Sequence, residues 1–338
     1  MTQISERFFE KGKNFLGCKY PFICGAMTWV SDPQLVSAVC NAGAFACLAG
    51  GNTPPDILEE QIDETYNLTN GNFAVNLITI APAYRAHLEL MKKKNLKYIV
   101  FAGSFPKQDE IKVAKETGAK VMCFASTLSI ANRMVRYGAD AIILEGMEAG
   151  GHVGHVTLAV LLQQVLFELE NIPVFVAGGI ATGKMAAHMF LMGAAGVQLG
   201  TRFAVAEESA THPAFKETFF RANARDAVST PQFDSRLPVV AVRALRNKGL
   251  DEFGRLQLKL IEQMDNGEIH RDQAQEEVEK YWMGALRKAA VDGDVKDGSL
   301  MAGQSVGLVN KTETVREIID DLVQGTEQEL IQVKSMLN

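Results

Sequence analysis

The sequence lacks the cysteine spacing that would cross-link the chain or hold a structural metal. Its 338 residues include five cysteines, an odd number, and no Cys-x-x-Cys pair occurs among them. No His-x-x-x-His pair suggests a metal site either. We therefore predict a reducing compartment, no disulfide framework and no bound metal. The cysteines are Cys18, Cys24, Cys40, Cys47 and Cys123.

Long apolar runs and an excess of basic residues are also absent. No run reaches the roughly 18 apolar residues of a membrane span, and the polar stretch 1–7 does not resemble a signal peptide. The formal net charge is −6, from 34 Lys and Arg against 40 Asp and Glu. A chain without a general basic surface is a poor ligand for nucleic acid. We expect a cytoplasmic protein that binds neither membranes nor nucleic acid.

The sequence is rich in apolar residues, and turn-forming residues interrupt its apolar runs at regular intervals. Hydrophobic residues make up 47% of the chain, which is enough for a large core. Eight short β-prone runs recur, each closed by glycine or polar residues and followed by a helical pattern. This alternation predicts right-handed βαβ units, and eight of them predict a closed (β/α)₈ barrel, a TIM barrel. The runs are 22–24, 44–48, 73–77, 98–101, 120–124, 141–144, 174–176 and 196–199.

The pattern changes after Arg202. Residues 207–296 are more charged and mainly helical, with the clearest helices at 253–264 and 273–288, and we expect no strands there. The predicted organisation is a barrel of residues 1–206 and 297–338 with a helical cap of residues 207–296. The C-terminal segment is predicted to return to the barrel and to close with an amphipathic helix.

Glycine-rich loops follow the last two predicted strands. Gly178 and Gly179 follow the seventh strand, and Gly200 and Thr201 follow the eighth. In barrels of this kind these two loops commonly hold a phosphate group, because backbone N–H groups can approach an anion there. Tight turns would also explain either loop alone. Their joint occurrence at the expected positions favours a phosphate-bearing ligand.

Two polar side chains lie at the same predicted barrel mouth. His152 stands on a glycine-flanked loop after the sixth strand, where an imidazole can move a proton near neutral pH. Asn76 ends the third strand and offers both a donor and an acceptor to a planar heterocycle. A planar ring that carries one phosphate would use all of these features, and FMN fits that description.

The same segments resemble the nitronate monooxygenase-like FMN flavoprotein superfamily, most closely its enoyl-acyl carrier protein reductase II branch. Two sequence motifs favour the reductase: Gly-Met-Glu-Ala-Gly-Gly-His at residues 146–152 and Gly-Ser-Leu-Met-Ala-Gly-Gln at residues 298–304. Two loops depart from that branch, namely 77–82 and 101–106, the second of which contains Phe105. The resemblance is carried by residues 20–21, 25–30, 49–52, 75–77, 145–152, 177–180, 197–203, 242–247, 293–295 and 298–304.

The resemblance implies an FMN enzyme that uses NADH or NADPH to reduce trans-2-enoyl thioesters in fatty acid biosynthesis. His152 would position the substrate and either transfer a proton or stabilise the enolate. Gln304 and Ser305 would contact the substrate. The positions expected to bind FMN are Gly25, Ala26, Met27, Asn76, Glu145, Gly150, Gly151, Ala177, Gly178, Gly179, Gln198, Gly200 and Thr201.

Other functions and partners remain open at this point. A nitronate monooxygenase would use His152 as a base while O₂ accepts electrons, and an NADH:quinone reductase is a third possibility. A non-redox phosphate-binding barrel or a non-catalytic binding protein explains the loops less well.

The thioester could be small or linked to an acyl carrier protein, with Arg236, Arg243, Arg246 and Lys248 as a basic docking patch. A solvated face or buried Arg pairs would explain that cluster equally, and a homodimer through the cap is expected from the resemblance.

Overall fold

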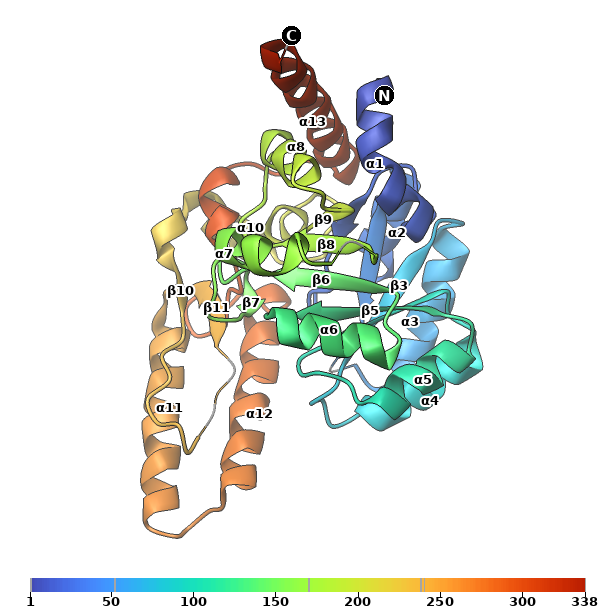
Figure 1. Ribbon diagram of the computed structural model, residues 1–338. Helices are drawn as coiled ribbons and strands as arrows, with labels where there is room; N and C mark the ends of the chain where they lie inside the picture. Colours follow the sequence, from blue (N-terminus) through green and yellow to red (C-terminus); the bar gives the residue numbers. More distant parts are fainter. Residues whose placement is uncertain (1, 52, 170, 238, 240, 338) are drawn as a thin grey trace.

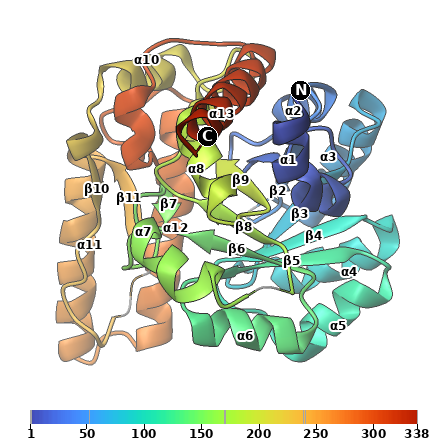
Figure 2. The ribbon, with the colours of Figure 1, turned by 45° about the horizontal axis from the view of Figure 1, so that its top comes forward.

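Eight parallel strands close into a barrel in the computed structural model, which describes residues 2–51, 53–169, 171–237, 239 and 241–337 (Figures 1 and 2). The predicted (β/α)₈ fold is confirmed, and each predicted run became a strand. Asn52, which belongs to one of the resembling segments, lies outside the described residues. The barrel strands, in ring order, are β1 (Phe22–Cys24), β2 (Phe45–Ala49), β3 (Phe73–Ile78), β4 (Tyr98–Ala102), β5 (Lys120–Ala125), β6 (Ala141–Glu145), β8 (Val174–Ala177) and β9 (Gly196–Leu199).

Helices surround the ring, and several of them begin at a capping residue. Asp32 accepts the N–H of Leu35 at the start of α2, and Thr127 caps α6, which ends at Gly138 with a φ of 106°. The barrel helices are α1 (Gln3–Leu16), α2 (Pro33–Asn41), α3 (Pro55–Leu68), α4 (Tyr84–Lys94), α5 (Gln108–Glu116), α6 (Leu128–Tyr137), α7 (Leu158–Leu161) with a π-helical turn (Leu162–Leu166), α8 (Gly183–Leu191), α9 (Thr201–Ala204) and α13 (Val315–Leu337).

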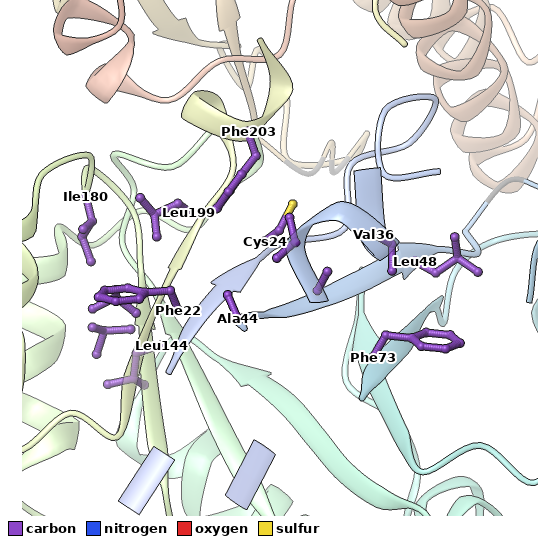
Figure 3. Close-up of a cluster of buried hydrophobic side chains, with 14 of the residues drawn as sticks. Phe22, Cys24, Val36, Ala44, Leu48, Phe73, Leu144, Ile180, Leu199 and Phe203 are labelled. Atoms are coloured by element: carbon purple, nitrogen blue, oxygen red, sulfur yellow. The ribbon is translucent and has the colours of Figure 1, made fainter. Parts of the chain in front are cut away.

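Side chains on the two faces of each strand form two separate apolar layers. The outward-facing ones pack against the helices, as Phe22, Leu144 and Leu199 do in Figure 3. The inward-facing ones, such as Ile143 and Phe175, fill the barrel interior. Because side chains alternate along a strand, this division fixes which residues at the strand ends point toward the barrel axis.

The N-terminal helix α1 closes the amino end of the barrel. Phe15 belongs to the interior cluster, and its carbonyl accepts a hydrogen bond of 2.8 Å from the Tyr98 hydroxyl. The termini lie on one side of the molecule, where α1 runs near α13 (Figure 1). With the amino end filled, a ligand can enter only at the carboxyl ends of the strands.

The expectation of a strand-free segment at 207–296 was wrong. Strands β10 (Ala227–Ser229) and β11 (Val242–Leu245) pair antiparallel there, and β11 also pairs with β7 (Gly151–His152). These strands have three and four residues, and Arg243 stands inside the buried β11. Alternation over so few residues gives no periodic signal, so the sequence could not predict this sheet.

The rest of this segment is helical. It contains α10 (Pro213–Arg221), a 3₁₀ turn (Ala224–Asp226), α11 (Lys248–Asp265) and α12 (Arg271–Ala290), and a second 3₁₀ turn (Gln304–Leu308) follows it. The hairpin of α11 and α12 projects from the barrel (Figure 1) and has its own apolar core, which includes Phe253 and Trp282. Phe215 and Phe219 of α10, by contrast, pack with the barrel's outer layer. The cap's exact boundaries stay a prediction.

In the described part of the chain, no helix combines the length and apolar character that a membrane crossing requires.

A glycine in α1 allows this helix to approach the barrel. A Cβ at Gly12 would lie 1.9 Å from the carbonyl oxygen of Ala195. We expect Gly12→Ala to lower the free energy of unfolding by about 1–3 kcal/mol, measured by urea denaturation, because the helix must shift outward. The control is Gly284→Ala in α12, where an added Cβ has no neighbour within 4 Å. This control should leave stability unchanged or raise it slightly, and equal losses in both variants would contradict the packing argument.

Candidate active site

A cavity of about 380 Å³ opens at the carboxyl ends of the barrel strands. Every predicted site residue lines it except Gln304, which is partly exposed outside the lining. The Gln304 backbone N–H is bound to the carbonyl of Glu148, at the start of a 3₁₀ turn, whereas the next residue, Ser305, is buried and faces the cavity. The structure therefore brings together His152, Ser305 and the thirteen positions expected to bind FMN, and it leaves Gln304 aside.

Three polar side chains form the cavity floor. Asn76, Glu145 and Gln198 each lie two residues beyond an inward-facing position of their strand, so they extend the interior layer at its carboxyl end. Asn76 is 6% exposed and Gln198 is 8% exposed. Neither side chain makes a hydrogen bond with any described residue. Because buried polar groups are normally paired, this floor fits a ligand that brings its own donors and acceptors.

Glu145 is an acid in a neutral environment. Glu145 lies opposite Ala177 of β8, the preceding Leu144 lies opposite Ala125 of β5, and no described cation approaches the carboxyl of Glu145. Burial raises its pKa from 4.5 to about 8. The group is therefore predominantly protonated at neutral pH and can donate a hydrogen bond to a ligand on the floor.

The ends of β8 and β9 present backbone donors to the cavity. The backbone N–H groups of Gly178, Gly179, Gly200 and Thr201 have no hydrogen-bond partner among the described residues. Positive φ angles of 105° and 70° at Gly178 and Gly179 favour glycine at both positions. Free N–H groups on neighbouring loops form an anion cradle, so the donor set fits the phosphate of FMN, as the sequence predicted.

His152 is held in place by a strand pairing that the sequence did not reveal. It lies in β7, opposite Val242 of β11, and Gly151 lies opposite Arg243. The imidazole lines the cavity and has no hydrogen-bond partner among the described residues. Burial lowers its pKa below 6.5, so the ring is neutral at pH 7. A neutral imidazole can donate a hydrogen bond from one nitrogen and accept a proton at the other.

Arg243 fastens the loop that carries His152. Its guanidinium is 4% exposed and donates from Nε to the carbonyl of Met147 at 2.8 Å and from Nη1 to that of Ala227 at 2.6 Å. No described carboxylate forms an ion pair with it. A single side chain thus joins the β6–β7 loop to β10 across β11. From the sequence we placed Arg243 in a basic docking patch, and no sequence feature indicated that it fastens this loop.

Apolar side chains from the cap form the roof. Phe215 of α10 and Trp282, Leu286 and Ala290 of α12 line the cavity, together with Met301. Sequence reasoning missed these residues because only tertiary packing brings α10 and α12 over the barrel mouth. The cavity therefore has a polar floor and an apolar roof, and no Lys or Arg of the described chain lines it.

The predicted basic docking patch does not form as expected. Arg243 is buried, and the exposed Arg236 and Lys248 are paired with Asp234, Asp265 and Asp297. Arg246 alone is exposed without an ion pair among the described residues. The structure thus favours the alternative of buried and paired cations. The described residues also contain no group of three or more His, Cys, Asp or Glu that could hold a metal ion.

Comparisons with known proteins identify the class. The profile of the family described as nitronate monooxygenase matches two overlapping stretches, residues 10–85 and 78–325. This chain belongs to that family of oxidoreductases, which confirms the resemblance.

Relatives with different printed names match over nearly the whole chain. The chain is 31% identical to a "(3aS,4S,5R,7aS)-5-hydroxy-7a-methyl-1-oxo-octahydro-1H-indene-4-carboxyl-CoA dehydrogenase" of Mycobacterium tuberculosis, over 91% of this chain and 93% of the relative. It is 28% identical to a "probable nitronate monooxygenase" of Bacillus subtilis, over 87% and 92%. The solved structure of FabK from Thermotoga maritima is 33% identical, with a TM-score of 0.85 and coverage of 96% and 98%. The relatives' names therefore support the family without selecting one reaction.

The buried Arg243 provides a test of the loop anchor. We expect Arg243→Gln to lower the free energy of unfolding by about 2–3 kcal/mol, because two buried carbonyls lose a charged donor. The measurement is urea denaturation in the absence of ligand. Arg246→Gln, an exposed substitution three residues away, should change stability by less than about 0.5 kcal/mol. A similar, small change in both variants would show that Arg243 does not fasten the loop.

The raised pKa of Glu145 predicts a pH-dependent stability. Between about pH 4.5 and pH 8 the folded state retains a proton that the unfolded state has lost, so this group makes stability fall with rising pH. The slope approaches about 1.4 kcal/mol per pH unit at most. Glu145→Gln removes that contribution. We expect the variant to gain stability relative to wild type as pH rises from 5 to 8 in urea titrations, and a constant difference would refute the shift.

Proposed function

We propose that this protein is an FMN-dependent oxidoreductase that uses NADH or NADPH to reduce the double bond of trans-2-enoyl thioesters. One observation carries the proposal. Four polar side chains that have no partner among the described residues, Asn76, Glu145, His152 and Gln198, line one cavity, and backbone N–H groups at one side of it are equally unpaired there. Such a set suits a planar heterocycle that carries a phosphate.

The chain's residues would divide the binding of FMN among them. The backbone of Gly178, Gly179, Gly200 and Thr201 would hold the phosphate, while Asn76, Glu145 and Gln198 would meet polar atoms of the ring. The Thr201 hydroxyl accepts the N–H of Gly303 at 3.0 Å, so the C-terminal segment is tied to the cradle. When bound, FMN supplies the hydride that the β-carbon of the substrate accepts.

His152 would act on the thioester itself. Its neutral ring can donate an N–H to the thioester carbonyl, where negative charge develops as the double bond is reduced. The enolate then takes up a proton at its α-carbon, which the N–H of His152 can supply, and the ring regains a proton from solvent after the product leaves. The apolar roof of Phe215, Trp282 and Leu286 would bind the acyl part and exclude water. The carboxyl-CoA substrate in the name of the M. tuberculosis relative supports a thioester as the substrate class.

A second function is favoured by the state of His152. A buried imidazole with a lowered pKa is unprotonated at neutral pH and can serve as a base. A nitronate monooxygenase would use it in this way, and relatives with that name match most of the chain. We rank this function second because a base for a small nitroalkane does not account for the apolar roof that the cap provides.

The five free thiols suit the cytoplasm, where we place the protein. We propose a coenzyme A thioester as the substrate in preference to one on an acyl carrier protein, since three members of the basic cluster are buried or paired. We also propose a homodimer through the cap. The molar mass in solution, measured by light scattering, would test it.

Purification and turnover test the proposed function. The protein should be yellow, release FMN on denaturation, and oxidise NADH or NADPH faster with crotonyl-CoA than with quinone or buffer alone. O₂ uptake with a nitronate should be slower than thioester reduction. A colourless protein that FMN cannot reconstitute would overturn the flavin, and rapid O₂ uptake with the nitronate alone would select the second function.

The role of His152 is tested by its replacement. His152→Ala should lower kcat for crotonyl-CoA about 10²–10⁴-fold while the FMN content stays near that of wild type, because the ring acts on the substrate. The control is His155→Ala, an exposed histidine on the same loop outside the cavity lining, which should retain full turnover. If His152→Ala reduces the thioester at the wild-type rate in single-turnover measurements, the assigned role is excluded.

A further inference from the structure

An anionic co-substrate cannot share the anion cradle of the cavity. The free N–H groups lie at the ends of β8 and β9, which are the last two strands of the closed ring. If FMN holds its phosphate there, the phosphates of a second ligand must be bound elsewhere. The described residues that line the cavity include no Lys or Arg that could bind them. A cation beside the cavity would therefore have to do so.

The segments after β4 and β5 bring such a cation beside the cavity, and β4 lies opposite β9 in the ring of eight strands. Phe105 follows β4, lines the cavity, and is 38% exposed despite its large aromatic ring. The guanidinium of Arg133 on α6 lies over that ring, with its central carbon 5.5 Å from the ring centroid. Ser126, which precedes α6, also lines the cavity. The Phe105–Arg133 pair thus borders the open end of the site.

Arg133 is incompletely satisfied where it stands. Among the described residues, its buried Nε has no hydrogen-bond partner and its guanidinium forms no ion pair with a carboxylate. On the neighbouring helix α5, the carboxylate of Glu110 accepts the backbone N–H of Lys107 and forms no ion pair with Arg133. A buried donor without an acceptor carries a cost that a ligand oxygen would offset.

The two side chains together match a phosphorylated adenosine. A guanidinium can bind phosphate through two parallel hydrogen bonds, and an exposed aromatic ring can stack on a nucleobase. Arg133 covers one part of the ring of Phe105, and more than a third of this residue remains open to solvent. Phe105 also lies in one of the two loops whose sequences depart from the reductase branch.

We propose that Phe105 and Arg133 form a second subsite, which binds the adenosine phosphate of a co-substrate at the mouth of the cavity. The inference rests on the proposed function insofar as a coenzyme A thioester and NAD(P)H both carry this group. The shared chemistry is a phosphate on adenosine, and its position on the sugar distinguishes the two sources. A 3′-phosphate belongs to coenzyme A and a 2′-phosphate belongs to NADPH, while NADH has a 5′-phosphate alone.

Binding of fragments tests the subsite without turnover. Isothermal titration of the purified, FMN-loaded protein with 3′,5′-ADP, 2′,5′-ADP, 5′-AMP and adenosine should show at least one phosphorylated fragment binding more tightly than adenosine. Arg133→Gln should weaken that fragment at least tenfold and leave adenosine unchanged, and Phe105→Ala should weaken all of the fragments that bind. The matched control is Arg136→Gln, an exposed cation one turn further along α6, which should change each Kd by less than twofold.

Each outcome has one meaning. Preference for 3′,5′-ADP assigns the subsite to the thioester, preference for 2′,5′-ADP assigns it to NADPH, and equal binding of all phosphorylated fragments assigns it to a 5′-phosphate. Wild-type protein that binds none of them, or Arg133→Gln that binds as wild type does, would overturn the proposal. A protein that binds a fragment but reduces no thioester would leave the subsite standing and reject the proposed function alone.

Discussion

Closure of eight short parallel strands into one ring is the constraint on which the site depends. Ladder pairing fixes the register of neighbours, as with Glu145 beside Ala177 and Cys24 beside Leu199. Strand alternation then decides which side chains point inward. Asn76, Glu145 and Gln198 come from three different strands, and they meet only because the ring closes with that register. A slip of one residue would move each of them to the outer apolar layer.

The polar floor conflicts with the rest of the core. Below it the interior consists mainly of apolar side chains, and α1 seals the amino end with Phe15, whose carbonyl also accepts a hydrogen bond from Lys120. Buried amides and a buried carboxyl without partners cost free energy, which the large apolar layers around them offset. An arrangement of this kind is typical of functional sites, where local stability is given up for groups that meet a ligand. The protonated Glu145 lessens that cost, because a neutral acid is easier to bury than an anion.

The sequence predicted the barrel and most of the floor because both depend on short-range patterns. The eight runs and the glycine loops could be read directly, and barrel geometry placed His152, Asn76 and Gly178 at one end. Long-range pairings could not be read in this way. Strand β7 has two residues and is defined by its partner β11, some ninety positions later, so neither shows a period of its own. The roof residues Phe215 and Trp282 depend on helix packing and carry no local signal.

The β7–β11 pairing ties the cap to the segment that carries His152. His152 stands opposite Val242, and Arg243 bonds both to Met147 before the histidine and to Ala227 of the adjacent strand. The same cap supplies Trp282 and Leu286 to the roof. A displacement of the cap would therefore move the imidazole of His152 and the apolar roof together. A ligand that contacts only the floor would bind equally well wherever the cap lies. A substrate that contacts both floor and roof would instead hold the cap against the barrel and fix the position of His152 relative to the ring of strands.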